Sequence, residues 1–232
     1  MGTVATTSFE PQRVRAILFD IDGTLADTDD AAVAKLAKLL SPLARAWPRL
    51  RPEPTARRII MAAETPLNAL YAWWDRLYLD ELTAPLLRLL PRRQRDHRPV
   101  PLVPGVQPML ESAHRHFPLG AVTARGRRSA LALLESAGIQ DYFSVVVTTR
   151  TARRAKPHPA PILWAADELG IAPENCLMVG DTTLDIRSAR AAGAQAAAVL
   201  CGFGERRELE RVGAHLILDS TADLLEHLPG QG

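Results

Sequence analysis

Apolar residues recur along the chain in short, nearly unbroken runs separated by longer mixed segments. Each run is apolar almost throughout rather than alternating, which is typical of parallel strands covered on both faces. The runs occupy residues 15–20, 118–124, 144–149, 176–181, 195–200 and 215–219. We therefore predict six strands of a mainly parallel sheet.

Helical periodicity fills the segments between most of these runs. The predicted helices span residues 106–116, 127–137, 159–169, 184–192, 205–212 and 221–228. In the third of them, one buried face is expected to carry Ile162, Leu163, Ala166 and Leu169. Strands that alternate with helices in this way predict a doubly wound α/β domain with a Rossmann-like core.

Residues 27–104 interrupt the alternation. No β-rich run occurs there, and Ala, Leu, Trp and Arg dominate, so the stretch is predicted to form several helices. We expect a helical cap domain at 27–104, inserted after the first strand into a catalytic core made of residues 1–26 and 105–232.

Composition narrows the class of protein further. The 232 residues are 47% hydrophobic and 23% charged with a net charge of +2, which excludes an acidic disordered chain and predicts no nucleic-acid partner. The start lacks a secretory signal pattern, and no apolar stretch approaches the ~18 residues that span a bilayer, so no membrane partner is expected. Cys176 and Cys201 fall in apolar segments and are expected to be free thiols. We expect a cytoplasmic monomer or homodimer.

Two acidic residues follow the first predicted strand in the sequence FDIDGT. Residues two apart in a strand face the same way, so Asp20 and Asp22 are expected to project together at its carboxyl end, where open α/β sheets bind ligands. Gly23 then allows a sharp turn. The alternative is a strand closed by a DG turn, in which Asp22 only shapes the loop.

A second acidic pair follows the fourth predicted strand, in GDTTLD. Asp181 is expected at the carboxyl end of that strand, with Asp185 one turn into the next helix. Thr182 and Asp185 also resemble a capping box, in which the acid caps the helix. The two roles are compatible.

Four carboxylates at one sheet edge repel each other strongly. At 4 Å and an effective dielectric near 20, each like-charged pair costs about 4 kcal/mol. Such a cluster requires cations, and oxygen ligands favour Mg²⁺ over zinc, for which the chain has no Cys or His set.

Lys156 and Thr123 complete the candidate site. Lys156 follows the third strand and is one of only three lysines, which suggests that a compact ammonium is needed there; the alternative is a solvated surface lysine. Thr123 ends the second strand just before a helix, a suitable place for a phosphate contact, although threonine is common at strand ends. Acids, a hydroxyl and an ammonium together suit a phosphoryl group and its metal.

In order and type, these four motifs resemble those of the haloacid dehalogenase superfamily, in the branch with a helical cap after the first strand. The resemblance covers the chain from about residue 14, and the C-terminal segment is similar to phosphoglycolate phosphatases. Many relatives have asparagine after the Thr or Ser of the second motif, where this chain has Ala124.

The resemblance implies a role for each residue. Asp20 would be the nucleophile that becomes an aspartyl phosphate, and Asp22 would protonate the leaving oxygen and then activate water. Mg²⁺ would be held by Asp20, Asp181 and the backbone carbonyl of Asp22, with Asp185 orienting metal-bound water or Lys156. Substrate contacts are expected from Thr123, Lys156, the backbone amide of Ala124 and Gly23.

We therefore expect a Mg²⁺-dependent phosphatase for a small phosphorylated metabolite, with phosphoglycolate as the leading candidate. Inorganic pyrophosphatase and a β-phosphoglucomutase-like phosphotransferase are the enzyme alternatives, and a non-catalytic binding module is the alternative outside enzymes. Three weaker features are better explained structurally: GFGERR at 202–207 as a turn, the arginines within 92–98 as a solvated linker, and His114, His116 and His158 as surface or loop residues.

Overall fold

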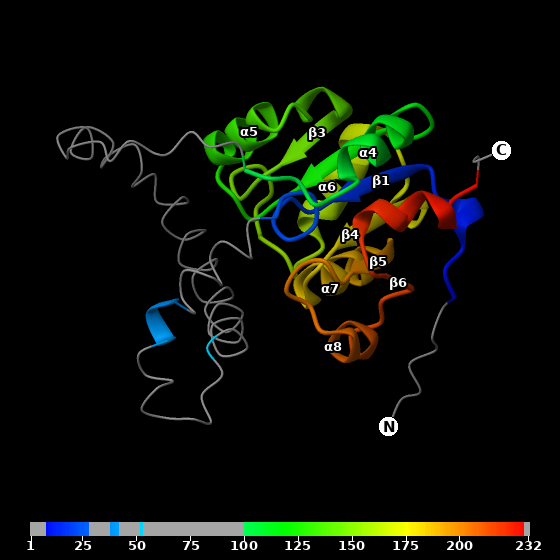
Figure 1. Cartoon of the computed structure of the whole chain (residues 1–232). Helices are drawn as coiled ribbons and strands as arrows, with labels where there is room; N and C mark the ends of the chain where they lie inside the picture. Colours follow the sequence, from blue (N-terminus) through cyan, green and yellow to red (C-terminus); the bar gives the residue numbers. More distant parts are fainter. Residues whose placement is uncertain (1–7, 28–37, 42–51, 53–99, 230–232) are drawn as a thin grey trace.

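A computed structural model describes residues 8–27, 38–41, 52 and 100–229 of the chain. Its centre is a six-stranded sheet in the order β3-β2-β1-β4-β5-β6, in which every neighbouring pair is parallel (Figure 1). The strands are β1 (Ala16–Phe19), β2 (Leu119–Val122), β3 (Phe143–Val147), β4 (Cys176–Gly180), β5 (Gln195–Val199) and β6 (Leu216–Leu218). All six predicted strands are thus confirmed, each to within about two residues at either end.

The strand order reverses direction between β1 and β4. From β1 the chain proceeds outward through β2 to β3, and then returns to the other side of β1 to build β4, β5 and β6. Neighbouring loops therefore diverge at the carboxyl ends of β1 and β4, and such a switch point is where open α/β sheets bind ligands.

Helices cover both faces of the sheet. They are α4 (Val106–His114), α5 (Arg127–Ser136), α6 (Ala160–Leu169), α7 (Thr183–Ala192) and α8 (Arg206–Arg211), with short 3₁₀ segments η1 (Pro11–Arg13), η2 (Gln140–Tyr142), η3 (Pro173–Asn175) and η4 (Thr221–His227). The predicted α-helix at 221–228 is a 3₁₀ helix instead; Ser220 caps its start by accepting a hydrogen bond from Ala222 N at 3.3 Å.

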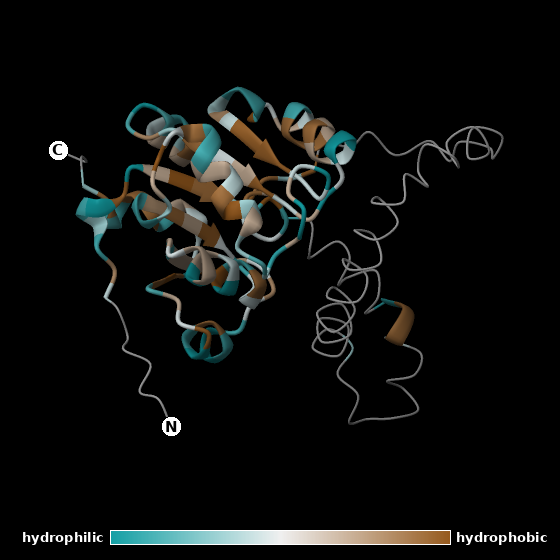
Figure 2. Cartoon of the chain, turned by 180° about the vertical axis from the view of Figure 1, so that it is seen from behind, coloured by the Kyte–Doolittle hydropathy of each residue, from teal (hydrophilic) through white to brown (hydrophobic). Residues whose placement is uncertain are grey.

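Two hydrophobic layers fill the space between the sheet and the helices. Along β1, Ile17 and Phe19 face the layer that includes residues of α4, α5 and η4, whereas Ala16 and Leu18 face the layer that includes residues of α6, α7 and α8. The four central strands are buried at every position and predominantly hydrophobic (Figure 2). Alternate strand residues thus serve opposite faces, which confirms the doubly wound fold.

Leu163 departs from its predicted place in the core. The buried face of α6 carries Pro161, Ile162, Ala165 and Ala166, whereas the Leu163 side chain is 42% exposed. Successive residues are about 100° apart around a helix axis. Leu163 is therefore rotated away from the buried face that Ile162 and Ala166 share.

The segment around residues 25–27 lies beside the segment around residues 100–103. Asp27 N donates to Pro101 O at 2.8 Å, Val103 N donates to Leu25 O at 2.9 Å, and Ala26 bridges Leu102. The chain therefore leaves the core and re-enters it at one place. The predicted cap, including the arginines within 92–98, lies almost wholly outside the described residues.

Two further sequence predictions concern features of the described residues. Cys176 and Cys201 are both free, the first buried and the second half-buried, as predicted. None of the helices in the described part of the chain has the length and apolar character needed to cross a membrane.

Candidate active site

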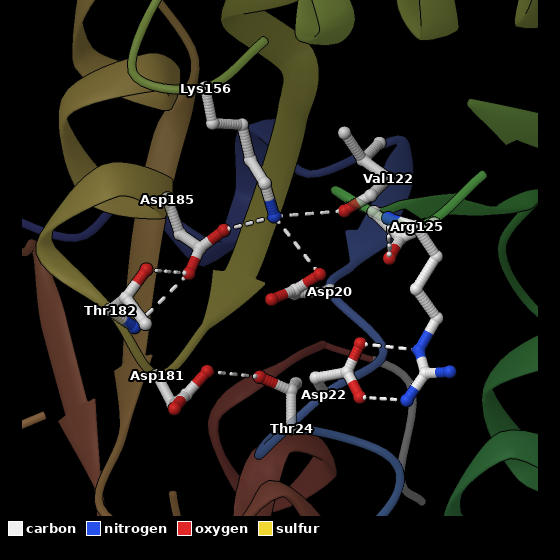
Figure 3. Close-up of polar contacts among 10 residues, drawn as sticks. Asp20, Asp22, Thr24, Val122, Arg125, Lys156, Asp181, Thr182 and Asp185 are labelled. Carbon is white, nitrogen blue, oxygen red and sulfur yellow. Dashed lines mark hydrogen bonds and ion pairs between the residues drawn. The ribbon is translucent and has the colours of Figure 1, made fainter. Parts of the chain in front are cut away.

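Asp20 and Asp181 directly follow β1 and β4, two strands that pair in register. Phe19 aligns with Val179, and Asp20 N donates to Val179 O at 2.9 Å. Parallel pairing therefore brings the two carboxylates to the same edge of the sheet, at the switch point. Figure 3 shows both acids facing a common space together with Lys156 and Asp185.

Lys156 links three elements of this edge. Its Nζ lies 2.9 Å from Asp20 Oδ1 and 2.6 Å from Asp185 Oδ1, and it donates to the Val122 carbonyl oxygen at 3.0 Å. The side chain is only 7% exposed. Burial alone would lower the pKa of Lys156, but Asp185 and Asp20 outweigh it and raise that pKa above its ordinary value, so the ammonium stays charged. The surface-lysine alternative is wrong.

Asp20 lies in an electrostatic environment in which burial and like charges outweigh its cationic partner. Burial raises its pKa well above the ordinary value for aspartate; Lys156 opposes this effect, while the neighbouring charges of Asp185, Asp181 and Asp22 add to it. A cation among these carboxylates would favour the ionised form of Asp20.

Asp185 caps α7, as its sequence position suggested, and also contacts Lys156. Its Oδ2 accepts hydrogen bonds from Thr182 N at 3.0 Å and Thr182 Oγ1 at 2.6 Å, which caps α7, while its Oδ1 pairs with Lys156. Gly180 leaves room for this arrangement, since a Cβ at that position would overlap the Asp185 carboxylate. The fully buried acid therefore joins the start of α7 to the lysine.

Asp181 is held on two sides by groups that sequence reasoning missed. The Thr24 hydroxyl donates to its Oδ1 at 3.2 Å, and Phe203 N donates to its Oδ2 at 2.9 Å. Phe203 belongs to the GFGERR segment, which bends at 202–203, as the predicted turn implies, and enters α8 at Arg206. Gly202 allows that turn to come close, because a Cβ there would overlap the Asp181 carboxylate.

Oxygen atoms of Asp20, Asp181 and Asp185 all lie within 4.8 Å of one another. When all three are ionised, these carboxylates carry three negative charges against one positive charge on Lys156. The donor set is hard oxygen throughout, so it suits a divalent ion such as Mg²⁺. The chemistry of the site therefore fits a metal. Asp185 lies in the same cluster as Asp20 and Asp181.

The Asp22 carboxylate is not part of this cluster and pairs instead with Arg125. Arg125 Nε donates to Asp22 Oδ2 at 2.6 Å and Nη2 donates to Oδ1 at 2.5 Å, a two-pronged ion pair visible in Figure 3. Gly23 makes the turn with a φ of +71°, as expected, and its N donates to Ala26 O at 3.0 Å. Arg125 was missed, although its spacing of two from Thr123 is a usable signal.

Thr123 follows β2 and is buried at the same edge. Its N donates to Val147 O at 2.9 Å, and its hydroxyl oxygen accepts a hydrogen bond from Arg125 N at 3.1 Å. Ala124 is half-buried beside it. The three histidines predicted to be surface or loop residues are found in such positions. His158 Nδ1 accepts from Ala160 N at 3.1 Å, and His114 and His116 are exposed, with His114 against the Tyr142 ring.

Comparison with known proteins gives the arrangement a family. The sequence profile of the haloacid dehalogenase-like hydrolases matches residues 17–199. The chain belongs to this family. The family assignment made from the four motifs is thus confirmed, and with it the prediction of a hydrolase.

Individual relatives cover nearly the whole chain. A phosphoglycolate phosphatase of Chromobacterium violaceum is 30% identical over 93% of this chain and 96% of its own length. The pyrophosphatase PpaX of Oceanobacillus iheyensis is 30% identical over 91% of this chain and 95% of its own. The structure of a haloacid dehalogenase family hydrolase from Deinococcus radiodurans, with bound phosphate and sodium, is 25% identical, covers 91% of this chain and 93% of its own, and has a TM-score of 0.64.

Proposed function

We propose that the protein is a phosphatase that hydrolyses a small phosphate monoester through an aspartyl phosphate on Asp20, with phosphoglycolate as the leading substrate. The observation that carries the proposal is the buried contact of Lys156 Nζ with both Asp20 and Asp185, next to Asp181, at the switch point of the sheet. Such a site combines a carboxylate nucleophile with positive charge for the transferring group. Relatives named phosphoglycolate phosphatase support the choice of substrate.

A metal ion is part of the proposal. Asp20, Asp181 and the backbone carbonyl of Asp22 would hold Mg²⁺, and Asp185 would orient its water or Lys156. When bound, Mg²⁺ neutralises charge on the carboxylates and the phosphoryl oxygens. Two positive charges would balance the excess of two negative charges that the three clustered carboxylates leave after pairing with Lys156.

The residues of the chain perform the remaining steps. One Asp20 oxygen forms a bond to phosphorus while the ester P–O bond breaks, and Asp22 gives its proton to the leaving oxygen. Asp22 then takes a proton from water, whose oxygen attacks phosphorus, and phosphate leaves as Asp20 is regenerated. Contacts to the phosphoryl oxygens would come from Thr123, Lys156 and the backbone of Ala124 and Gly23.

Residues 27–104 are proposed to form the helical cap that covers the substrate and excludes bulk water during transfer. The proposal is supported by the return of the chain beside its point of departure, at residues 25–27 and 100–103. We further propose that the enzyme works in the cytoplasm as a monomer or homodimer.

A second candidate substrate is inorganic pyrophosphate. The relative named pyrophosphatase PpaX is as similar in identity as the phosphoglycolate phosphatase of Chromobacterium violaceum. The chemistry at Asp20 would be the same, with phosphate as the leaving group.

A substrate panel tests the proposal. Purified protein with Mg²⁺ is assayed for phosphate release from phosphorylated metabolites, including phosphoglycolate, and from pyrophosphate, ranked by kcat/KM. Asp20→Asn is the matched variant, since it keeps the shape of the side chain and removes the nucleophilic carboxylate. We expect turnover by the wild type and none by the folded variant; undiminished turnover in Asp20→Asn would exclude Asp20 as the nucleophile.

A further inference from the structure

Positive charge is concentrated on the two loops that follow β2 and β3. The segments 123–134 and 142–166 contain no acidic residue and seven basic ones, namely Arg125, Arg127, Arg128, Arg150, Arg153, Arg154 and Lys156. The loops are neighbours, because Thr149 N donates to Arg125 O at 3.3 Å. For a chain with a net charge of only +2, this is a strong local asymmetry. Such a surface attracts anions to the adjacent site.

Three of these arginines stand where a helix disfavours them. Arg127 and Arg128 are the first two residues of α5, and Arg125 precedes its N-cap, Gly126. This is the positive end of the helix dipole, where acidic residues are stabilising and basic ones are not. Stability of the helix therefore does not explain their presence.

Arg125 connects this basic surface to the proposed acid-base residue. Its guanidinium engages both oxygens of Asp22, at 2.6 and 2.5 Å, and its Nη1 donates to Ser129 Oγ at 3.0 Å. The Arg125 and Asp22 side chains are 29% and 30% exposed, so this ion pair is open to a small ligand, unlike the pairs of Lys156.

This contact directs the Asp22 carboxylate toward Arg125 rather than into the cluster of site carboxylates. Both oxygens bind Arg125, and the carboxylate lies outside the cluster of Asp20, Asp181 and Asp185 (Figure 3). To reach a leaving oxygen on a phosphoryl group at Asp20, Asp22 has to exchange its partner.

We propose that Arg125 recognises a second anionic group of the substrate, a carboxylate or a phosphate, and that this group replaces Asp22 on the guanidinium and frees it for proton transfer. The inference rests on the proposed function and adds a substrate class to it: phosphate compounds with a second anion. A guanidinium group forms bidentate hydrogen bonds with either a carboxylate or a phosphate. The second anion of the substrate can therefore take the place of the Asp22 carboxylate on Arg125. Substrates without a second anion leave Asp22 paired and are turned over more slowly.

The experiment compares three substrates with Mg²⁺ present. Phosphoglycolate offers a carboxylate as the second anion, pyrophosphate offers a phosphate, and 2-hydroxyethyl phosphate has a neutral hydroxyl in the same place. Each is assayed for kcat and KM with the wild type, Arg125→Met and Arg125→Lys. Arg115→Met is the matched control, because Arg115, the residue that follows α4, is 67% exposed and pairs with Glu111.

We expect the wild type to prefer phosphoglycolate, pyrophosphate or both over 2-hydroxyethyl phosphate. Arg125→Met should lower kcat/KM for the preferred substrate by roughly 10- to 100-fold, the value of a hydrogen-bonded charge. It should not lower kcat/KM for the neutral substrate, because the variant also releases Asp22 from its ion pair. Arg125→Lys should fall between them, because it keeps the charge without the fork, and it carries the test if Arg125→Met fails to fold. Arg115→Met should match the wild type. The preferred substrate identifies the second anion as carboxylate or phosphate.

Two results would overturn the inference while leaving the proposed function intact. The first is an equal loss of kcat/KM for all three substrates in the Arg125 variants, which would make Arg125 a purely positioning residue. The second is a substrate preference in the Arg125 variants that equals that of the wild type. Failure of the wild type to release phosphate from any substrate would overturn both proposals.

Discussion

Lys156 and Asp185 form an ion pair of 2.6 Å in which both side chains are almost completely excluded from solvent. The acid caps α7 with one oxygen and holds the lysine with the other, so the helix start and the proposed phosphoryl site share one carboxylate. Fold stability and the geometry of the site are therefore coupled at this pair.

Breaking this pair should destabilise the protein as well as inactivate it. Removing one partner of a buried pair typically costs 3–5 kcal/mol, because the other charge stays buried without compensation, so we expect a loss of about that size in Lys156→Met. Urea unfolding measures the loss, and phosphate release measures activity.

The matched control for Lys156→Met is Arg206→Met. The pair of Arg206 with Asp219 is 3.1 Å long, but its side chains are 51% and 85% exposed, so its loss should cost under about 1 kcal/mol. Equal losses in the two variants would show that burial at Lys156 has no energetic consequence.

Metal binding should be measurable without turnover. If Mg²⁺ binds among the carboxylates of the folded state only, Mg²⁺ at 100 times its Kd should stabilise the protein by about 2.7 kcal/mol, and EDTA should reverse the effect. Thermal unfolding of the wild type and of Asp181→Asn, with and without Mg²⁺, tests this expectation.

Asp181→Asn should lose most of the Mg²⁺-dependent rise in Tm, and EDTA should abolish phosphate release by the wild type until Mg²⁺ is restored. If neither Mg²⁺ nor EDTA changed the Tm or the activity of the wild type, the argument from the carboxylate cluster would be wrong.

Gly202 should be intolerant of any side chain. A Cβ at this position would overlap the Asp181 carboxylate and come within 2.6 Å of the Gly23 carbonyl oxygen, so Gly202→Ala must displace the edge that carries Asp181. A misplacement of about 1 Å can cost roughly 100-fold in rate, and we expect a loss of that order in kcat/KM.

Gly138→Ala separates this effect from general backbone strain. Gly138 has a φ of +67° and nothing within 4 Å of its added Cβ, so that substitution should cost stability and leave kcat/KM unchanged. Comparable kinetic losses in both variants would argue against the close approach at Asp181.

The positions of the main site residues could be predicted because strand ends determine them. Asp20, Asp181 and Thr123 each directly follow a parallel strand, so the alternation of apolar runs and helices was sufficient to place them at one edge. Lys156 could be singled out because lysine is rare in this chain. Asp185 could be singled out because it completes a capping pattern with Thr182.

The residues that were missed depend on loop conformation rather than on strand register. Arg125, Thr24 and Phe203 reach the acids through turns whose shape is determined by contacts between segments distant in sequence. The pairing of Asp22 with Arg125 depends on the rotamers of both side chains, which the sequence pattern does not determine. The exposure of Leu163 depends on how α6 is rotated about its axis against the sheet. The hydrophobic pattern alone does not determine that rotation to within one residue.

His215 should make stability depend on pH in the acidic range. Partial burial lowers its pKa below the usual 6.5 and the nearby Arg190 guanidinium lowers it further; together they outweigh the influences that raise it, Glu10 among them. Its Nδ1 accepts a hydrogen bond from Ala196 N at 2.9 Å, which the neutral ring can do and the protonated ring cannot. The unfolded chain therefore binds a proton more readily than the folded chain. The stability that neutral His215 contributes is complete above about pH 6.5 and declines as the pH falls through the window between that value and the lowered pKa.

Thermal unfolding between pH 5 and 8 should thus show a lower Tm at the acidic end, and His215→Gln should flatten that slope. Arg190→Gln should flatten it in part, since it removes one cause of the shift. The same substitution at the exposed His116 is the control for the loss of a histidine as such. A slope that persists in His215→Gln would place the titrating group elsewhere.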